Sequence, residues 1–225
     1  MGTNITLTSE DGFELAAYTA EPEGAARGGV VVIQEIFGVN SHIREVVDRF
    51  AAAGYLAIAP AVFDRVERGV ELGYGPDDLQ KGIGYIAGGQ LDFAKVLADA
   101  RAAGRHVASA GKVGITGYCF GGLVTAASSV QSASVFACGS SYYGGNTVTL
   151  IGDQPAVPLQ AHYGELDAYI PMSDVQKIKG AWSKAEVYVY PADHGFNCDQ
   201  RGTFHAQSAA LAQARTFRFF DKHLG

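Results

Sequence analysis

The segment from Lys112 to Val124 contains one cysteine, Cys119, in the pattern Gly-x-Cys-x-Gly-Gly. β-branched residues before the cysteine favour a strand, and the glycines leave room for an abrupt turn into a helix. This is a thiol version of the nucleophile elbow, in which a strand-to-helix turn exposes the attacking group. The backbone N–H groups near Phe120, at the start of the helix, would face an oxygen that becomes negative during attack, and the helix N-terminus would favour a thiolate. The pattern predicts nucleophilic catalysis by Cys119, and the alternative is a tight turn with a buried structural cysteine.

A cysteine nucleophile needs a base within hydrogen-bonding reach and a third group that fixes the tautomer of the base. His194 is the best candidate among six histidines, because its loop directly follows the last predicted strand. Asp167 follows another predicted strand by a few residues and is the candidate acid, with Glu165 as a rival. The chain order of nucleophile, acid and histidine is that of the α/β-hydrolases.

The elements that would position these residues alternate between strand and helix along the chain. A two-strand hairpin comes first, and a continuous apolar run then indicates a strand buried on both faces. Ser41 is expected to cap the first helix, and the many glycines between residues 61 and 90 predict a loop-rich excursion that could cover a site. The order predicts an α/β, doubly wound fold with a mostly parallel sheet and right-handed crossovers. The predicted strands are 4–8, 13–19, 30–33, 55–59, the strand before Cys119, 134–138, 159–163 and 185–190, and the predicted helices are 42–53, 91–103, 123–129, 172–182 and 204–223.

Glu35 comes shortly after the apolar run Val30–Ile33. A carboxylate at this point would lie at the carboxyl edge of the sheet, where open α/β sheets bind their ligands. The alternative interpretation of Glu35 is a solvated acid in a loop.

Composition limits the class of protein. A chain of 225 residues with 48% hydrophobic content can bury one sizeable core, and without a linker, repeat or low-complexity segment we expect a single domain over residues 1–225. The net charge of −6 and scattered basic residues argue against nucleic acid as a partner. Three cysteines without C-x-x-C spacing predict neither a disulfide framework nor a zinc site, which fits the cytoplasm. No apolar run is long enough to predict a membrane span.

Five segments resemble the dienelactone hydrolases, also called carboxymethylenebutenolidases, and the similarity spans nearly the whole chain. The cysteine at the elbow makes the resemblance quite specific, since most α/β-hydrolases carry serine at this position. These segments are Gln34-Glu-Ile-Phe-Gly-Val-Asn40, Gly117-Tyr-Cys-Phe-Gly-Gly122, Tyr142-Tyr-Gly144, Gly164-Glu-Leu-Asp167 and His194-Gly-Phe196.

The resemblance implies an α/β-hydrolase fold with Cys119 as nucleophile, His194 as base and Asp167 as its orienting acid. The implied reaction opens an enol lactone of the 4-carboxymethylenebut-2-en-4-olide type through an acyl-cysteine, with no cofactor and no metal. The backbone N–H groups of Ile36 and Phe120 are implied as the oxyanion hole. Glu35 is implied as a switch that contacts the resting thiol and helps to deprotonate it when substrate binds.

One position departs from the family pattern. Family members that act on the carboxylated dienelactone hold its carboxylate with arginines, one of them four residues after the histidine, and here that position is Cys198. We expect Cys198 to be a small buried filler, with a second redox-active thiol as the alternative. The residues predicted to contact substrate, from the resemblance and their loop positions, are Phe37, Lys81, Tyr85, Tyr143, Phe196 and Arg201.

Thiol chemistry restricts the substrate independently. In a tetrahedral intermediate the sulfur competes with the substrate oxygen as leaving group, and a thiol with a pKa of about 8.5 leaves more easily than an alkoxide. Enol lactones, aryl esters and thioesters are therefore favoured, so the expected partner is a small lactone or ester, and the protein is expected to be a monomer or weak homo-oligomer.

Other functions remain open on the sequence alone. A carboxylesterase or thioesterase acting on another activated acyl group would use the same residues, and a non-catalytic ligand-binding domain would use the same crevice. A metallohydrolase with His162, Asp167 and His194 is conceivable from the residue types. A nucleotide or flavin protein is less well supported, because neither G-x-G-x-x-G after the first parallel strand nor a P-loop occurs.

Overall fold

The computed structural model describes residues 2–225 and divides into two compact units. The first unit ends at Val113, and the second runs from Gly114 to Gly225. Met1 lies outside the described residues, and the single-domain organisation of residues 1–225 stays a prediction. Among residues 2–225, no helix combines the length and the apolar character needed to cross a bilayer.

The first unit contains the predicted hairpin and the buried strand that follows it. The strand order is β1-β2-β4-β3, with antiparallel pairing of β1 with β2 and of β2 with β4, and parallel pairing of β3 with β4. All five residues of β3 are buried, as the continuous apolar run predicted. The strands are β1 (Thr3–Thr8), β2 (Glu14–Ala20), β3 (Gly29–Ile33) and β4 (Leu56–Pro60).

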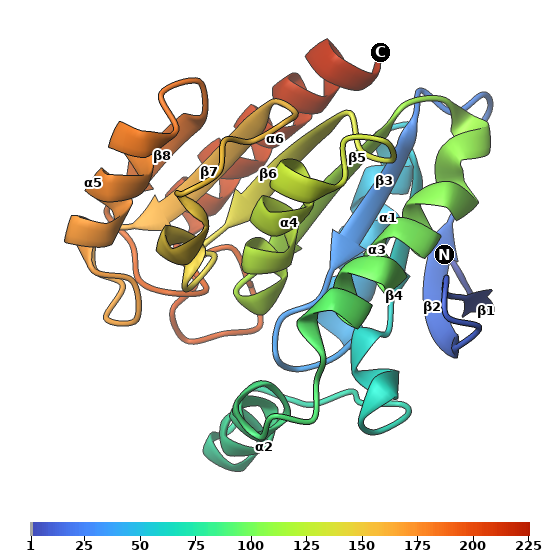
Figure 1. Cartoon of the computed structure of the whole chain (residues 1–225), viewed down its shortest axis with the longest axis horizontal. Coiled ribbons are helices and arrows are strands. Elements are labelled where there is room, and N and C mark those ends of the chain that lie inside the picture. Colours follow the sequence, from blue (N-terminus) through green and yellow to red (C-terminus); the bar gives the residue numbers. More distant parts are fainter. Residues whose placement is uncertain (1) are drawn as a thin grey trace. The chain divides into compact units, whose positions relative to one another are not determined.

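Two long helices cover β3 and β4 from opposite faces (Figure 1). They are α1 (Ser41–Ala52) and α3 (Phe93–Val107). The predicted cap of α1 is wrong by one residue: the side chain of Asn40 accepts a hydrogen bond from the N–H of Ile43 at 3.3 Å, and the helix begins at Ser41. Asparagine caps a helix at least as well as serine, so the earlier of two adjacent capping residues takes the role.

The excursion from 61 to 90 contains more regular structure than its glycines predicted. A short 3₁₀ helix spans Val62–Arg65, and α2 spans Pro76–Ala87. Proline at the first helical position and two acidic residues in the first turn are strong helix-start signals, and they outweigh the interior glycines. Gly82 has a packing reason, because a Cβ at this residue would lie 2.5 Å from the carbonyl oxygen of Ile36. The helix therefore packs directly on the loop that follows β3.

The second unit has the strand order β5-β6-β7-β8, and its strands pair in parallel. Helix α4 covers one face of β6 and α6 the other, as expected for a doubly wound sheet (Figure 1). Four of the six strand pairings within the two units are parallel, which confirms the predicted mostly parallel α/β organisation. The elements are β5 (Val113–Tyr118), α4 (Phe120–Gln131), β6 (Cys138–Tyr142), β7 (Leu159–Gly164), α5 (Met172–Ala181), β8 (Glu186–Tyr190) and α6 (Ala206–Leu224).

Strand β6 lies further along the chain than residues 134–138, which the apolar pattern predicted. Two buried serines belong to it, and each hydroxyl has a partner. Ser140 Oγ lies 2.8 Å from Thr216 Oγ1, and Ser141 Oγ donates to the carbonyl of Gly122 at 2.9 Å. Because these hydrogen bonds satisfy the hydroxyls, serine is tolerated in a central strand. The strand ends at Tyr142, and the next residue, Tyr143, has a positive φ of 35°.

Gly122 is expected to be the least replaceable glycine of the elbow. A Cβ there would lie 2.8 Å from Gly144 Cα and closer still to the carbonyl oxygen of Tyr142, so backbone would have to move. We expect Gly122→Ala to lower the free energy of unfolding by at least about 2 kcal/mol. Gly180→Ala in α5 is the matched control: nothing lies within 4 Å of its Cβ position, and alanine should add about 0.5–1 kcal/mol. Urea unfolding followed by circular dichroism measures both, and equal stabilities would contradict the close approach.

Candidate active site

Cys119 occupies the turn between β5 and α4 in a conformation that non-glycine residues rarely adopt, with φ 55° and ψ −114°. Its N–H donates to the carbonyl of Tyr142 at 3.0 Å, which ties the turn to β6. Gly117 permits the close strand-to-helix contact, because a Cβ there would lie 2.8 Å from Thr125 Oγ1 and closer to the carbonyl of Gly121. The strained turn holds the Cys119 side chain at the end of the strand, half-buried.

His194 follows β8 and hydrogen-bonds the two residues that the sequence paired with it. Its Nδ1 lies 2.7 Å from Oδ2 of Asp167, and it also hydrogen-bonds the side chain of Cys119. His194 and Asp167 are both buried. The second unit thus brings the predicted nucleophile, base and acid together, although they are up to 75 residues apart in the chain.

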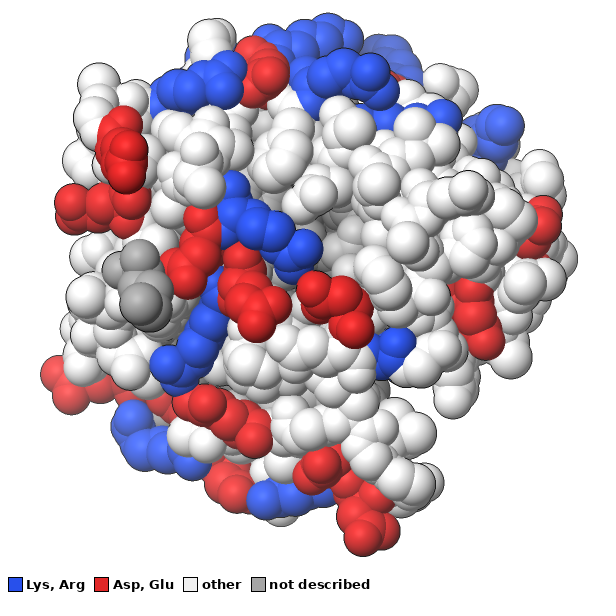
Figure 2. Space-filling view, turned by 180° about the vertical axis from the view of Figure 1, so that it is seen from behind, with Lys and Arg blue, Asp and Glu red and all other residues white. Residues whose placement is uncertain are grey.

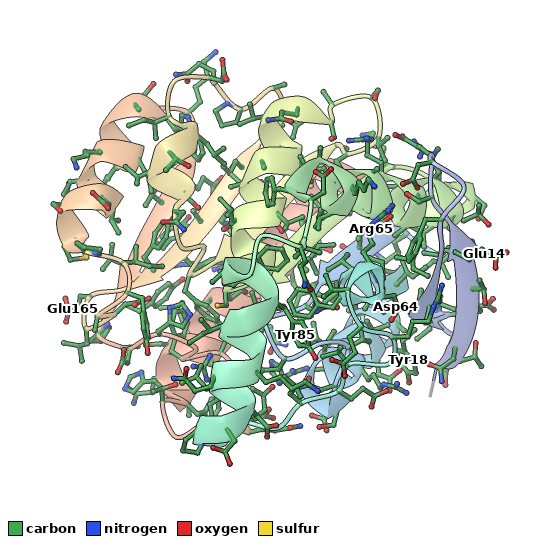
Figure 3. The ribbon with its side chains drawn as sticks, turned by 60° about the horizontal axis from the view of Figure 1, so that its bottom comes forward. Glu14, Tyr18, Asp64, Arg65, Tyr85 and Glu165 are labelled. Carbon is green, nitrogen blue, oxygen red and sulfur yellow. The ribbon has the colours of Figure 1, made fainter. Side chains whose placement is uncertain are left out.

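The loop after β7 orients Asp167. Its Oδ1 accepts hydrogen bonds from the backbone N–H groups of Tyr169 at 2.8 Å and Ile170 at 3.2 Å, which leaves Oδ2 for His194. A carboxylate that accepts from Nδ1–H fixes the tautomer of the neutral ring in which Nε2, on the other side, can accept a proton. Glu165, the rival acid, is exposed and lies at the periphery of the second unit (Figure 3). Asp167 is therefore the acid that contacts His194.

The protonation of His194 follows from three competing effects. Burial lowers the pKa of His194, whereas the hydrogen bonds to Asp167 and Cys119, together with their negative charges, raise it. The attractive interactions prevail, and the pKa of His194 rises to about 10. At neutral pH the imidazole is therefore held as a cation beside the sulfur.

Aromatic rings enclose the imidazole of His194. The ring centroid of Tyr143 lies 5.1 Å from it and that of Tyr169 5.2 Å, and Phe196 packs on Tyr143 at 5.4 Å. Tyr143 and Phe196, both predicted pocket residues, are fully buried, whereas Tyr169 is 69% exposed and Leu166 64%. Neither Tyr169 nor Leu166 was among the residues predicted to contact substrate. Their signal was the presence of large apolar residues within two positions of the candidate acid in a loop.

Arg201 lies against the turn that carries His194. Gly195 has a φ of 78°, and a Cβ on it would lie 2.6 Å from Arg201 Cζ. Cys198 is buried in the same turn, and its N–H donates to the carbonyl of Gly195 at 3.0 Å. The guanidinium is thus placed next to Gly195, although Arg201 is six positions further along the chain.

His162 lies in the core of the second unit, where both ring nitrogens have partners. Nδ1 lies 2.7 Å from the hydroxyl of Tyr190, and Nε2 lies 2.9 Å from Oε1 of Gln160. Burial, and then the positive charge of Arg215, lower the pKa of His162 to about 3. Because its nitrogens are engaged in this network, His162 does not join Asp167 and His194 in a metal-binding group.

The remaining predicted site residues belong to the first unit. Glu35 and Phe37 are buried in the loop after β3, next to Ile36. Lys81 and Tyr85 both extend from α2 to one carboxylate, with Lys81 Nζ 2.9 Å from Glu67 Oε1 and the Tyr85 hydroxyl donating to Oε2 at 2.7 Å. The roles of these first-unit residues in catalysis stay predictions.

Comparison with known proteins gives one consistent result. The family model described as "Dienelactone hydrolase family" matches residues 15–224. A protein of Synechocystis named "Putative carboxymethylenebutenolidase" is 36% identical over 241 residues, covering 99% of this chain and 97% of its own length. A Salmonella typhimurium protein of the same name is 33% identical, and the match covers 100% of this chain and 89% of the Salmonella protein.

Solved structures agree with these relatives. The crystal structure named "Putative Dienelactone Hydrolase" from Klebsiella pneumoniae is 31% identical, with a TM-score of 0.85 over 98% of both chains. A Pyrococcus furiosus esterase shares the fold at 15% identity, with a TM-score of 0.71. The chain therefore belongs to the dienelactone hydrolase family, a family of hydrolases, and has the α/β-hydrolase fold that its sequence predicted.

Proposed function

We propose that this protein is a cysteine-dependent hydrolase of lactones or activated esters, and that it opens an enol lactone of the dienelactone type through an acyl-cysteine intermediate. The observation that carries the proposal is the position of His194, which lies 2.7 Å from Asp167 and hydrogen-bonds Cys119 at the strained elbow. An imidazolium beside a cysteine favours the thiolate, which is the nucleophilic form.

The first half-reaction forms the acyl-enzyme. The sulfur of Cys119 attacks the carbonyl carbon, and the C–O bond to the leaving oxygen then breaks. The N–H of Phe120, at the start of α4, is one donor for the oxyanion. The second donor, carried over from the family resemblance, is the N–H of Ile36, and Glu35 is the proposed switch that controls deprotonation of the resting thiol.

The second half-reaction follows from the same pKa balance. Once the sulfur carries an acyl group, its negative charge no longer raises the pKa of His194, while burial still lowers it. The imidazolium therefore becomes a stronger acid at the moment when the leaving oxygen needs a proton. The neutral His194 that results can then remove a proton from the water that hydrolyses the thioester, with Asp167 holding the ring.

Two features of the second unit suit an activated acyl substrate. Tyr169 places exposed apolar surface beside His194, and Leu166 is exposed in the same loop, so the organic part of a substrate could pack there. Arg201 places a guanidinium against Gly195, and we assign to it the role of the arginine that Cys198 replaces. Lys81 is the weaker candidate for a substrate carboxylate, because Glu67 already binds it.

The pH dependence should reveal His194 as the acid that protonates the leaving group. As pH rises through about 10, His194 loses its proton, so kcat/KM for phenyl acetate should fall, because phenolate leaves poorly without one. For 4-nitrophenyl acetate, whose leaving group needs no proton, kcat/KM should fall much less. Circular dichroism over the same pH range controls for unfolding. Identical alkaline limbs for both esters would assign the proton to another group.

A hydrolysis panel tests the proposed function directly. We expect turnover of cis- and trans-dienelactones, aryl esters and acyl thioesters to exceed that of the matching ethyl esters by at least about 100-fold, since the sulfur is expelled in preference to an alkoxide. Uncarboxylated lactones test Arg201: with wild type they should show a higher KM than carboxylated ones, and Arg201→Gln should remove the difference. Comparable turnover of ethyl and aryl esters, or no turnover of any member, would contradict the proposal.

A further inference from the structure

A cleft of about 420 Å³ lies in the second unit at the edge of the sheet opposite the triad. It opens where β7 and β8 begin, whereas Asp167 and His194 follow the ends of these strands. A five-residue strand spans roughly 17 Å, so the cleft and the triad are separated by about the length of a strand. The lining residues include Leu159, Trp182, Lys184, Glu186, Phe219 and Lys222.

A second cavity of about 250 Å³ shares three lining residues with the cleft: Glu186, Phe219 and Lys222. It adds Arg215 and Arg218 of α6 to the lining. Because they share residues on both β8 and α6, the two cavities are neighbours, and we consider them together. We call the pair the β8–α6 groove.

The walls of the groove are apolar and ordered. Trp182 is almost completely buried, and its Nε1 donates to the carbonyl of Asp153 at 2.8 Å, which leaves the ring fixed at the base. Phe219 is also buried, and Leu159 and the proline-rich segment before β7 complete the apolar lining. A concave site of several hundred Å³ with apolar walls and a few polar groups has the usual form of a small-molecule site.

The polar groups at the groove are predominantly cationic. Lys184, Arg218 and Lys222 are exposed, and none has an ion-pair partner among residues 2–225. Arg215 lies over the ring of Tyr188 at 4.0 Å, and within the described part of the chain it forms no ion pair with a carboxylate. Figure 2, which views the molecule from behind the view of Figure 1, shows many Lys and Arg residues along the upper edge of this face. This concentration is local, because the net charge of the chain is −6.

Among residues 2–225, Glu186 is the one acidic residue that lines the groove, and it forms no ion pair with these cations. Its Oε2 accepts hydrogen bonds from Gln160 Nε2 at 3.1 Å and from the Tyr188 hydroxyl at 2.9 Å. The carboxylate is thus bound by neutral groups of β7 and β8. The cations consequently remain available for an anion in the groove.

We propose that the β8–α6 groove binds a small organic anion with an aromatic or branched apolar body. The carboxylate or sulfonate of this ligand pairs with Lys222 and Lys184 or Arg218 at the rim. Its body packs on Phe219, Leu159 and the edge of Trp182. Neither a bare phosphate nor a neutral hydrocarbon matches both parts of the groove, because each would satisfy only one of them.

Trp182 provides a local signal for testing this site, because it is the single tryptophan of the chain. The probe is 8-anilinonaphthalene-1-sulfonate, which accepts energy from tryptophan. We expect saturable energy transfer from Trp182, displaced by 2-naphthoate and not by neutral 2-naphthalenemethanol. The double variant Lys184→Glu/Lys222→Glu should weaken binding at least tenfold, and Lys179→Glu, an exposed lysine of α5 outside the groove, should leave it unchanged.

Two outcomes would overturn the proposal. One is equal displacement by the acid and the alcohol, which would remove the role of the cations. The other is equal binding by the double variant and by Lys179→Glu, with native circular dichroism in both. Alkylation of Cys119 with iodoacetamide separates this site from the triad: binding at the groove should survive alkylation, whether or not the protein hydrolyses esters.

Discussion

Cys119→Ala should abolish hydrolysis of aryl esters, with a fall in kcat on the order of 10⁴-fold or more. The sulfur is the proposed atom that bonds to the acyl carbon, and alanine offers no replacement at the end of β5. Stopped-flow measurement with 4-nitrophenyl acetate should also lose the rapid first release of nitrophenolate, because no acyl-enzyme can form. Binding of the substrate should be affected far less than its turnover.

Cys138→Ala is the matched control for this variant. Cys138 is buried in β6 of the same unit, so its loss should change stability slightly and leave turnover intact. Iodoacetamide gives an independent measurement, since Cys119 is half-buried while Cys138 and Cys198 are buried. One alkylation per chain, at Cys119, should inactivate the protein. Full activity of Cys119→Ala would exclude the acyl-cysteine mechanism.

Asp167→Asn should have the second largest effect, a fall in kcat on the order of 10⁴-fold with little loss of stability. The amide oxygen can still accept from the N–H groups of Tyr169 and Ile170, so the loop keeps its turn. The amide nitrogen would then face Nδ1 of His194, where it favours the tautomer in which Nδ1 accepts. That tautomer places the ring proton on Nε2, and the imidazole can no longer take a proton on that side.

The pH profile distinguishes this effect from simple misfolding. Loss of the Asp167 charge removes one of the interactions that raise the pKa of His194, so the alkaline limb should move to lower pH. Asp174→Asn is the control, because Asp174 is a surface acid that pairs with Lys177 in the first turn of α5. If both variants retained wild-type kcat and pH profile, Asp167 would have no orienting role.

The sequence was sufficient to predict the order of the strands and of every long helix except α2, and to place Cys119, His194 and the candidate acid in loops that follow predicted strands. It could not decide between Asp167 and Glu165, since both occupy the loop after β7. The decision lies in a folded turn: the N–H groups of Tyr169 and Ile170 hold Asp167 against His194. Such hydrogen bonds leave no periodic signal in the sequence.

The errors in the predicted elements have similar causes. β6 was placed too early because Ser140 and Ser141 look unsuitable for a central strand until their partners on α6 and α4 are known. Helix α2 was read as loop because Gly82 suggested flexibility, whereas it allows close packing on Ile36. In both cases a contact between distant segments overrides local preference.

The buried imidazole of His162 sets an acid limit on the fold itself. Its pKa is lowered to about 3 in the folded chain, whereas a histidine in an unfolded chain takes up a proton near pH 6.5. Between these two pH values the unfolded state binds more protons than the folded state. Lowering the pH in this range therefore shifts the folding equilibrium toward the unfolded state. The free energy of unfolding should therefore fall as the pH drops from about 6.5 toward 3, and this loss should persist in variants that lack the catalytic residues.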